Sequence, residues 1–202
     1  MLILASQSPT RQRLLRDAGV RFEVRPSGLD ERTLEIAAVH NGADARGVAR
    51  LLAEQKALAV AGLAPDAVVI GADQTLALGD ELLHKPADLG AARDQLEHLR
   101  HKTHRLHAAV CLVQNGSLLW SHLETAELTM RDFSPEEREE VLALEGPGAL
   151  ESVGGYRLEG PSLRLFEAIT GDYFTILGLP LLPLLSALRH FAPESLMRPV
   201  TA

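Results

Sequence analysis

Residues 2–31, LILASQSPTRQRLLRDAGVRFEVRPSGLDE, decide how the chain begins to fold. The apolar run Leu2–Ala5 predicts a buried strand, and Thr10–Ala18 predicts a helix after a short turn. Ser8 and Pro9 suit the N-cap and the first helical position. Because free N–H groups and the helix dipole favour negative charge, this hydroxyl-rich turn predicts an anion site. An ordinary strand–turn–helix with solvated arginines fits the same residues.

Composition excludes several classes of protein. The chain has 202 residues, a formal net charge of −7 and 4% aromatic residues, which argues against a nucleic-acid polymer as partner. Cys111 is the only cysteine and lies in an apolar run, so we expect a buried, inert thiol and no cysteine zinc site. The sequence shows no signal-peptide pattern and no apolar run of about 20 residues, which predicts a cytoplasmic protein without a membrane partner.

Strand and helix patterns alternate along the rest of the chain. Further strands are predicted at Arg21–Arg25, Ala67–Ile70 and Leu163–Ile169, and hairpins at Leu76–Leu83 and at His104–Gln114 with Leu118–Met130. Further helices are predicted at Ala43–Ala61, from Asp88 to Leu99, from Ser134 to Leu144 and from Pro180 to Phe191. The order predicts an α/β fold, with a mixed twisted sheet flanked by helices. We expect residues 1–192 to form one domain with two lobes and a central cleft, and residues 193–202 to form a frayed tail.

Charged residues beside these elements suggest chemistry. Asp73 follows a buried strand and Gly71-Ala72, so we expect it at the carboxyl end of that strand, where α/β proteins bind ligands. A carboxylate that caps a turn would look the same. Glu31 follows a turn and could join Asp73 in holding a divalent cation. Lys85 suits phosphate binding, although a solvated loop lysine fits better on its own. Lys56 lies within a helix, where a lone lysine is usually at the surface.

Four histidines recur every three residues, at His98, His101, His104 and His107. The spacing is similar to that of metal ligands. However, a helix is predicted to end near Leu99 and a strand to begin near His104, so the four side chains should not share one face.

Eight segments together resemble the Maf family of nucleoside triphosphate pyrophosphatases. The segments are LASQSPTRQRLL, PSGLDE, EQKALAV, VVIGADQTL, HKPAD, HRLHAAV, VGGYRLEGPS and GDYFTILGLPLLPLL, in the family's order. The resemblance covers residues 2 to about 190 and implies a fold like that of inosine triphosphate pyrophosphatase. It implies hydrolysis of a nucleoside triphosphate to the monophosphate and pyrophosphate, with a divalent cation, Mg²⁺ or Mn²⁺, and often a homodimer.

The resemblance also assigns residues. Asp73 matches the family's catalytic carboxylate, and Glu31 matches a cleft carboxylate that helps with metal or water. The phosphate-binding positions of the family match Ser8, Arg11, Lys56 and Lys85.

Departures from the family pattern bear on substrate. Thr10 replaces the first of two arginines, and Arg13 is close enough in sequence to compensate. Glu159 replaces a glutamine of the base pocket, and Ala108 replaces a strand threonine. These changes resemble the subgroup associated with 7-methyl-GTP, since an ionised carboxylate accepts hydrogen bonds from the guanine edge. A salt bridge of Glu159 with Arg157 or Arg164 is the alternative.

The sequence also allows a second function, which is not enzymatic. Maf-like proteins are linked to division arrest, so a nucleotide-binding regulator with little turnover is the alternative function. Loss of the arginine at Thr10 favours that reading, whereas the retained Asp73, Lys56 and Lys85 favour an enzyme.

Overall fold

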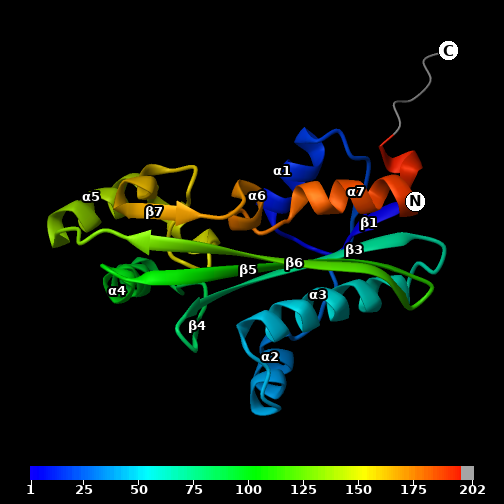
Figure 1. Cartoon of the computed structure of the whole chain (residues 1–202), viewed down its shortest axis with the longest axis horizontal. Coiled ribbons are helices and arrows are strands. Elements are labelled where there is room, and N and C mark those ends of the chain that lie inside the picture. The colour runs from blue at the N-terminus through cyan, green and yellow to red at the C-terminus, as the bar shows by residue number, and fades with distance from the viewer. Residues whose placement is uncertain (197–202) are drawn as a thin grey trace. The chain divides into compact units, whose positions relative to one another are not determined.

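The structure, a computed structural model, describes residues 1–196. Seven strands form a mixed sheet in the order β2-β1-β3-β5-β6-β7, with β4 paired to β3 (Figure 1). The strands are β1 (Leu2–Leu4), β2 (Glu23–Val24), β3 (Val68–Leu78), β4 (Glu81–Leu83), β5 (Thr103–Gln114), β6 (Ser117–Met130) and β7 (Phe166–Thr170). Helices flank this sheet, so the predicted α/β class is confirmed.

The α-helices of the described chain are α1 (Pro9–Asp17), α2 (Glu31–His40), α3 (Ala45–Ala61), α4 (Leu89–Leu99), α5 (Pro135–Glu145), α6 (Tyr173–Ile176) and α7 (Leu181–Phe191). Short 3-10 helices are η1 (Gly146–Glu151), η2 (Pro161–Leu165) and η3 (Pro193–Ser195). Helix α2 is absent from the predicted elements. Its start is encoded by Asp30, whose carboxylate accepts the Thr33 N–H at 3.1 Å.

Two compact units divide the chain. Among the described residues, the first unit comprises Met1–Gln74, Ala108–Glu124 and residues 173–196, and the second comprises Thr75–His107 and Thr125–Asp172. Strands β3, β5 and β6 each contribute residues to both units.

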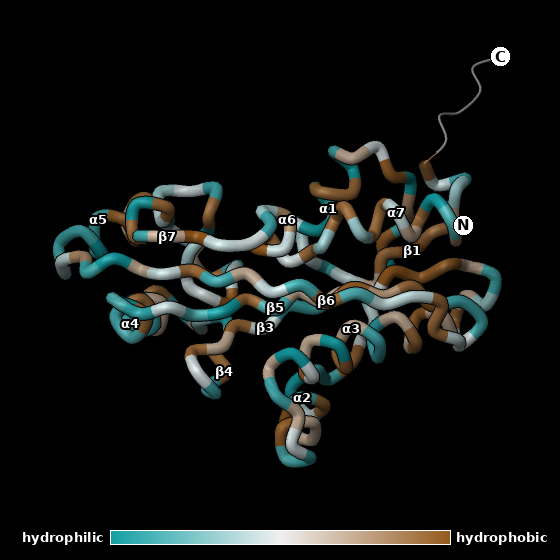
Figure 2. The backbone as a smooth tube through the Cα atoms, viewed as in Figure 1, coloured by the Kyte–Doolittle hydropathy of each residue, from teal (hydrophilic) through white to brown (hydrophobic). Residues whose placement is uncertain are grey.

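The core of the first unit has two sides because strand residues alternate in direction. Leu2 and Leu4 of β1 belong to a cluster with α1 and α7, whereas Ile3 belongs to a cluster with α3. Figure 1 shows α3 on one side of these strands and α1 and α7 on the other, and Figure 2 shows how apolar the central strands are. Such two-sided burial is what a continuous apolar run predicts.

Packing in the second unit joins helices α4 and α5 with η1 and η2. Asp88 and Ser134 cap α4 and α5 through their side chains, as predicted. The β5–β6 hairpin turns at Asn115 and Gly116, which both have positive φ values of 51° and 71°. Those values suit a two-residue hairpin turn, and the Asn-Gly prediction is confirmed.

The segment predicted to be a frayed tail starts with the 3-10 helix η3. Ser195, in η3, is buried, and its carbonyl accepts the Arg21 N–H at 2.9 Å. The rest of the expected frayed tail, from residue 197 on, lies outside the described residues.

Candidate active site

Asp73 lies in the middle of β3 and not at its carboxyl end, so that prediction is wrong. The strand predicted to end at Ile70 continues through Gly71 and Ala72. Gly71 stays in the strand, where its missing side chain admits helix α3. A Cβ atom there would lie 2.0 Å from the Ala53 carbonyl oxygen. The neighbouring parallel strand β1 does end at this level, since Leu4 pairs with Ile70. Asp73 therefore lies just beyond the carboxyl end of β1, which is the edge that the ligand rule describes.

Lys56 reaches Asp73 because α3 packs so closely on β3. Its Nζ lies 2.6 Å from Asp73 Oδ1 and 2.7 Å from Glu31 Oε2. Lys56 is only 6% exposed and Asp73 7% exposed. The expectation that a lone helical lysine lies at the surface is therefore wrong here. Ala53 and Ala57 are small enough to bring this face of α3 against Gly71, and Lys56 is carried inward with it.

Glu31 occupies the first position of α2, and this helix was not predicted from the sequence. The Asp30 cap fixes where this helix begins, and Glu31 therefore starts a helix that packs on α3. The Glu31 side chain is half exposed, whereas Lys56 beside it is buried. The ammonium group of Lys56 thus contacts two carboxylates, of which Asp73 is buried and Glu31 is accessible to solvent.

Burial raises the pKa of the Asp73 carboxyl above its usual range, and Lys56 and Arg11 partly offset this shift. Glu31 adds a smaller contribution that raises the same pKa, since two negative charges repel. A carboxylate that binds protons more readily than usual is a better general base near neutral pH.

Arg11 is buried and holds three segments together. Its Nε donates to the Gly178 carbonyl at 2.8 Å, and its Nη1 donates to the Ala72 carbonyl at 3.0 Å and to Ser6 Oγ at 3.2 Å. Most of its donors are therefore used within the first unit. Burial lowers its pKa, while Asp73 and Glu31 act in the opposite direction.

Ser8 caps α1, as predicted, and its hydroxyl accepts the Arg11 N–H at 3.4 Å. Arg13, which is close enough in sequence to compensate for Thr10, is exposed on the same helix. Ser6 was not singled out in the sequence. It is buried, and its hydroxyl accepts from both Arg11 and the Ser8 N–H, so it organises the turn after β1.

Gln74 is a second residue that the sequence reading missed. It follows Asp73 in β3 and points to the opposite face, as alternation requires. Its amide donates to the carbonyls of Thr175 and Ile176 in α6, both at 3.0 Å. Because Gln74 is tied to α6 while Asp73 is tied to α3, the strand is fixed from both sides at this point.

Lys85 and Glu159 belong to the second unit. Both are exposed, Lys85 after β4 and Glu159 in a turn between η1 and η2. The ion pairs of Arg157 and Arg164 are with Glu145 and Glu140, and Glu159 makes a smaller electrostatic contribution to Arg157.

The four spaced histidines have different surroundings. His98 pairs with Glu81, and His101 is exposed with a positive φ. His104 is buried against Tyr156, while His107 contacts Thr125. Within residues 1–196, no three His, Cys, Asp or Glu side chains gather as a metal group. Cys111 is buried, and burial raises its thiol pKa to about 12, as expected of an inert cysteine.

No helix within residues 1–196 has the length and apolar character needed to cross a bilayer.

Comparison with known proteins identifies the family. Residues 1–191 match the family described as Maf-like protein. A protein of Brucella abortus and one of Brucella suis, both named 7-methyl-GTP pyrophosphatase, are 50% and 51% identical over 189 residues, covering 94% of this chain and 95% of each relative. A protein of Rhodopseudomonas palustris named nucleoside triphosphate pyrophosphatase is 47% identical over 190 residues, covering 94% of this chain and 93% of the relative. A HAM1 protein of Coxiella burnetii has a TM-score of 0.41 at 17% identity, over 65% of this chain and 73% of that one. The chain belongs to the Maf family.

Proposed function

We propose that this chain hydrolyses a nucleoside triphosphate between its α- and β-phosphates, releasing the monophosphate and pyrophosphate. The observation that carries the proposal is the buried Asp73–Lys56 pair with Glu31 at the end of β1. A buried ion pair costs desolvation and is a weak source of stability, so a functional reason for its charges is favoured. The names of relatives at about half identity point to the same activity.

Asp73 is the proposed catalytic base. In the reaction, a water oxygen bonds to the α-phosphorus while the bond from that phosphorus to the α–β bridging oxygen breaks. Pyrophosphate takes the electron pair of the broken bond, and the water proton passes to an Asp73 carboxylate oxygen. The raised pKa of Asp73 favours that proton transfer near neutral pH.

The residues fit a hard divalent cation such as Mg²⁺ or Mn²⁺. The carboxylate oxygens of Asp73 and Glu31 are the donors that such an ion prefers, and Lys56 lies against one oxygen of each carboxylate. Two protein carboxylates completed by phosphate oxygens and water are a usual magnesium environment. Bound there, the cation neutralises phosphate charge.

Phosphate binding is proposed for Ser8, Lys56 and Lys85. Arg11 contributes its positive charge next to Asp73, while its hydrogen bonds keep the turn after β1 in place. Preorganised positive charge of this kind stabilises a transition state in which negative charge spreads over phosphate oxygens.

A preference for 7-methyl-GTP is proposed through Glu159. Methylation at N7 places positive charge on the guanine ring, and an ionised carboxylate favours such a ring as well as its N–H donors. The names of the Brucella relatives support this choice. A homodimer stays a prediction from the family resemblance, and a cytoplasmic location stays a prediction from the sequence patterns.

The test is a product-resolved hydrolysis panel with Mg²⁺ or Mn²⁺. It compares 7-methyl-GTP, GTP, UTP, dTTP and CTP, with an assay that separates pyrophosphate from orthophosphate and preparations checked for contaminating inorganic pyrophosphatase. We expect the monophosphate and pyrophosphate, with 7-methyl-GTP as the best substrate. Orthophosphate as the first product would contradict the proposal. Binding without turnover of any nucleotide would favour the regulator and direct attention to Thr10.

Substrate preference has its own test. Glu159→Gln should lower the ratio of kcat/KM for 7-methyl-GTP over UTP by about tenfold, the effect of one hydrogen-bonding or charge contact. Glu151→Gln, which alters another exposed glutamate of the same region, is the matched control. An unchanged ratio in Glu159→Gln would remove Glu159 from the base site.

A further inference from the structure

The charges around Asp73 balance without any ion. Arg11 and Lys56 are two cations, and Glu31 and Asp73 are two carboxylates, all within the first unit. We call these four residues the Asp73 cluster. A divalent cation added to a neutral cluster leaves an excess of two positive charges in a largely buried place, which is unfavourable.

Lys56 also occupies the position between the two carboxylates. One ammonium group lies 2.6 Å from Asp73 and 2.7 Å from Glu31, which is where a shared cation would be held. The lysine and the ion therefore compete for the same oxygen atoms.

Lys56 and Arg11 differ in how freely they can respond to that competition. Three hydrogen bonds to Ser6, Ala72 and Gly178 fix the guanidinium of Arg11. Lys56 makes its ion pairs only with side chains, through a flexible four-carbon stem and a compact charge. Lys56 is therefore the cation that can leave the carboxylates.

We propose that Lys56 is an internal counter-ion that a divalent cation must displace from Asp73 and Glu31, so that the metal binds weakly until nucleotide phosphates receive the lysine. This inference rests on the proposed function, because it takes the nucleotide as the source of those phosphates. Linkage then requires that nucleotide raises metal affinity and that metal raises nucleotide affinity by the same factor. When substrate is absent, Lys56 stays paired with the two carboxylates and the Asp73 cluster keeps a net charge of zero.

A titration with Mn²⁺ alone tests the inference, with free Mn²⁺ followed by electron paramagnetic resonance at pH 8. The wild-type chain should bind Mn²⁺ with a Kd on the order of 1 mM or weaker, as sites with little net charge do. Lys56→Met should bind one ion at least about tenfold more tightly, because the competing charge is gone.

Matched variants locate the effect. Lys56→Arg keeps the positive charge and should stay as weak as wild type. Lys102→Met makes the same substitution at an exposed lysine that donates to the His98 carbonyl, and it should not change binding. Adding Asp73→Asn to Lys56→Met should remove the gained affinity.

Two results would overturn the inference. One is a folded Lys56→Met variant that binds Mn²⁺ no more tightly than wild type. The other is micromolar binding by the wild-type chain itself, which needs no variant to fold. The titration contains no nucleotide and measures no turnover. Failure here is therefore separate from failure of the hydrolysis panel, which tests the proposed function alone.

Discussion

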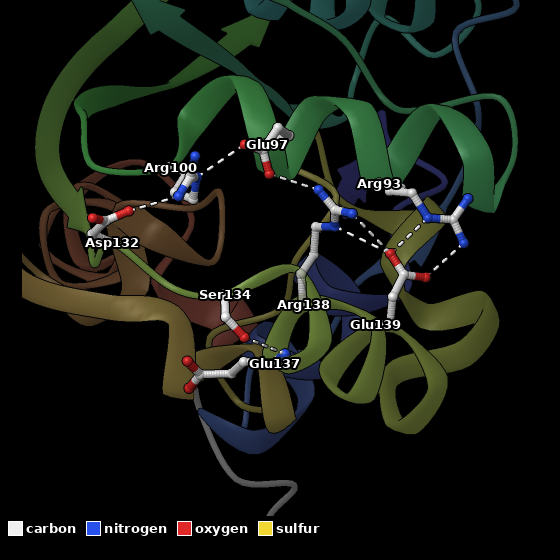
Figure 3. A network of polar contacts seen from close by, with 8 residues as sticks. All are labelled: Arg93, Glu97, Arg100, Asp132, Ser134, Glu137, Arg138 and Glu139. Atoms are coloured by element: carbon white, nitrogen blue, oxygen red, sulfur yellow. Dashed lines mark hydrogen bonds and ion pairs between the residues drawn. The ribbon is translucent and has the colours of Figure 1, made fainter.

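Two groups of charges in this chain use the same residue types under opposite conditions. The Asp73 cluster of the first unit is mostly buried, with Asp73 at 7% exposure. In the second unit, a partly exposed network of ion pairs joins α4, α5 and the segment before α5 (Figure 3), and its members are Arg93, Glu97, Arg100, Asp132, Arg138 and Glu139. We call this second group the α4–α5 network.

Carboxyl pKa values move in opposite directions in the two groups. Burial raises the pKa of Asp73 despite two nearby cations. Hydrogen bonds and charge from Arg93 and Arg138 lower the pKa of Glu139 to about 2, because Glu139 remains hydrated. Solvent exposure, and not the number of cationic partners, therefore decides whether a carboxylate becomes a proton acceptor or a permanent charge.

The first prediction extends this comparison to a buried base in the second unit. His104 is fully buried beside Tyr156 and Phe166, and burial lowers its pKa to about 4. In the unfolded chain His104 takes up a proton near pH 6.5, whereas in the folded chain it stays neutral down to about pH 4. The unfolding free energy is therefore fully present above pH 6.5 and falls as the pH is lowered to about 4. The loss should reach about 3 kcal/mol.

Urea unfolding of wild type and His104→Gln between pH 7.5 and 4 measures that loss as a difference between the two proteins. Glutamine keeps an acceptor for the Tyr156 hydroxyl, which lies 2.6 Å from His104 Nε2. His101→Gln, at an exposed histidine, is the control. Parallel pH dependence in all three proteins would break the link between burial and pKa.

The second prediction tests the close packing of α3 on β3, which buries Lys56 beside Asp73. A Cβ atom at Gly71 would lie 2.0 Å from the Ala53 carbonyl oxygen and 2.8 Å from Ala57 Cβ, so Gly71→Ala must push α3 from β3. We expect a loss of about 1–3 kcal/mol in unfolding free energy and lower activity, because Lys56 moves with the helix. Gly62→Ala, whose Cβ would have ordinary contacts at 3.7 Å, is the control for urea unfolding. Equal stability of the two variants would contradict the close approach.

A third prediction concerns the pH dependence of activity. Turnover should be lost as pH falls through the raised pKa of Asp73. Lys56→Gln removes a charge that lowers this pKa, so the acidic limb should move to higher pH. Glu31→Gln removes a charge that raises it, so the limb should move to lower pH. Profiles of kcat/KM against pH give both shifts, and shifts of the same sign would refute the assignment of the limb to Asp73.

The smallest effect is expected in the α4–α5 network. Glu139→Gln removes an exposed ion pair with Arg93 and a partly buried one with Arg138, and should cost less than about 1 kcal/mol of unfolding free energy. The cost should shrink further at about 1 M salt because exposed charges are screened. Glu127→Gln, which removes a single exposed pair with Arg105, is the comparison for urea unfolding. A large cost that does not depend on salt would show that exposure is not what distinguishes the two groups.

Local chemistry explains the parts of the fold that could be predicted from the sequence. Caps at Ser8, Asp88 and Ser134 and the Asn115-Gly116 turn depend on neighbouring residues, and each is confirmed. Close packing of α3 explains the parts that could not. The approach of Ala53 to Gly71 keeps β3 continuous past Asp73 and buries Lys56, and neither residue's own neighbours encode that contact.

The candidate site residues also divide into those that could be predicted from the sequence and those that could not. The family resemblance, and not helical spacing, pointed to Lys56, since periodicity favours a surface position for it. Glu31 and Asp73 were predicted to act together, and they contact the same ammonium group. Gln74 and Ser6 gave no signal beyond their place in the quoted motifs, because their partners lie far along the chain or depend on Arg11.

The most direct test of the account is the turnover of Asp73→Asn with 7-methyl-GTP and a divalent cation. Circular dichroism and nucleotide binding serve as the checks of fold and site. The account predicts that kcat falls at least a hundredfold, the scale of a lost general base, while the variant stays folded and still binds nucleotide. A folded Asp73→Asn variant with wild-type kcat would contradict the assignment of Asp73 as the catalytic base.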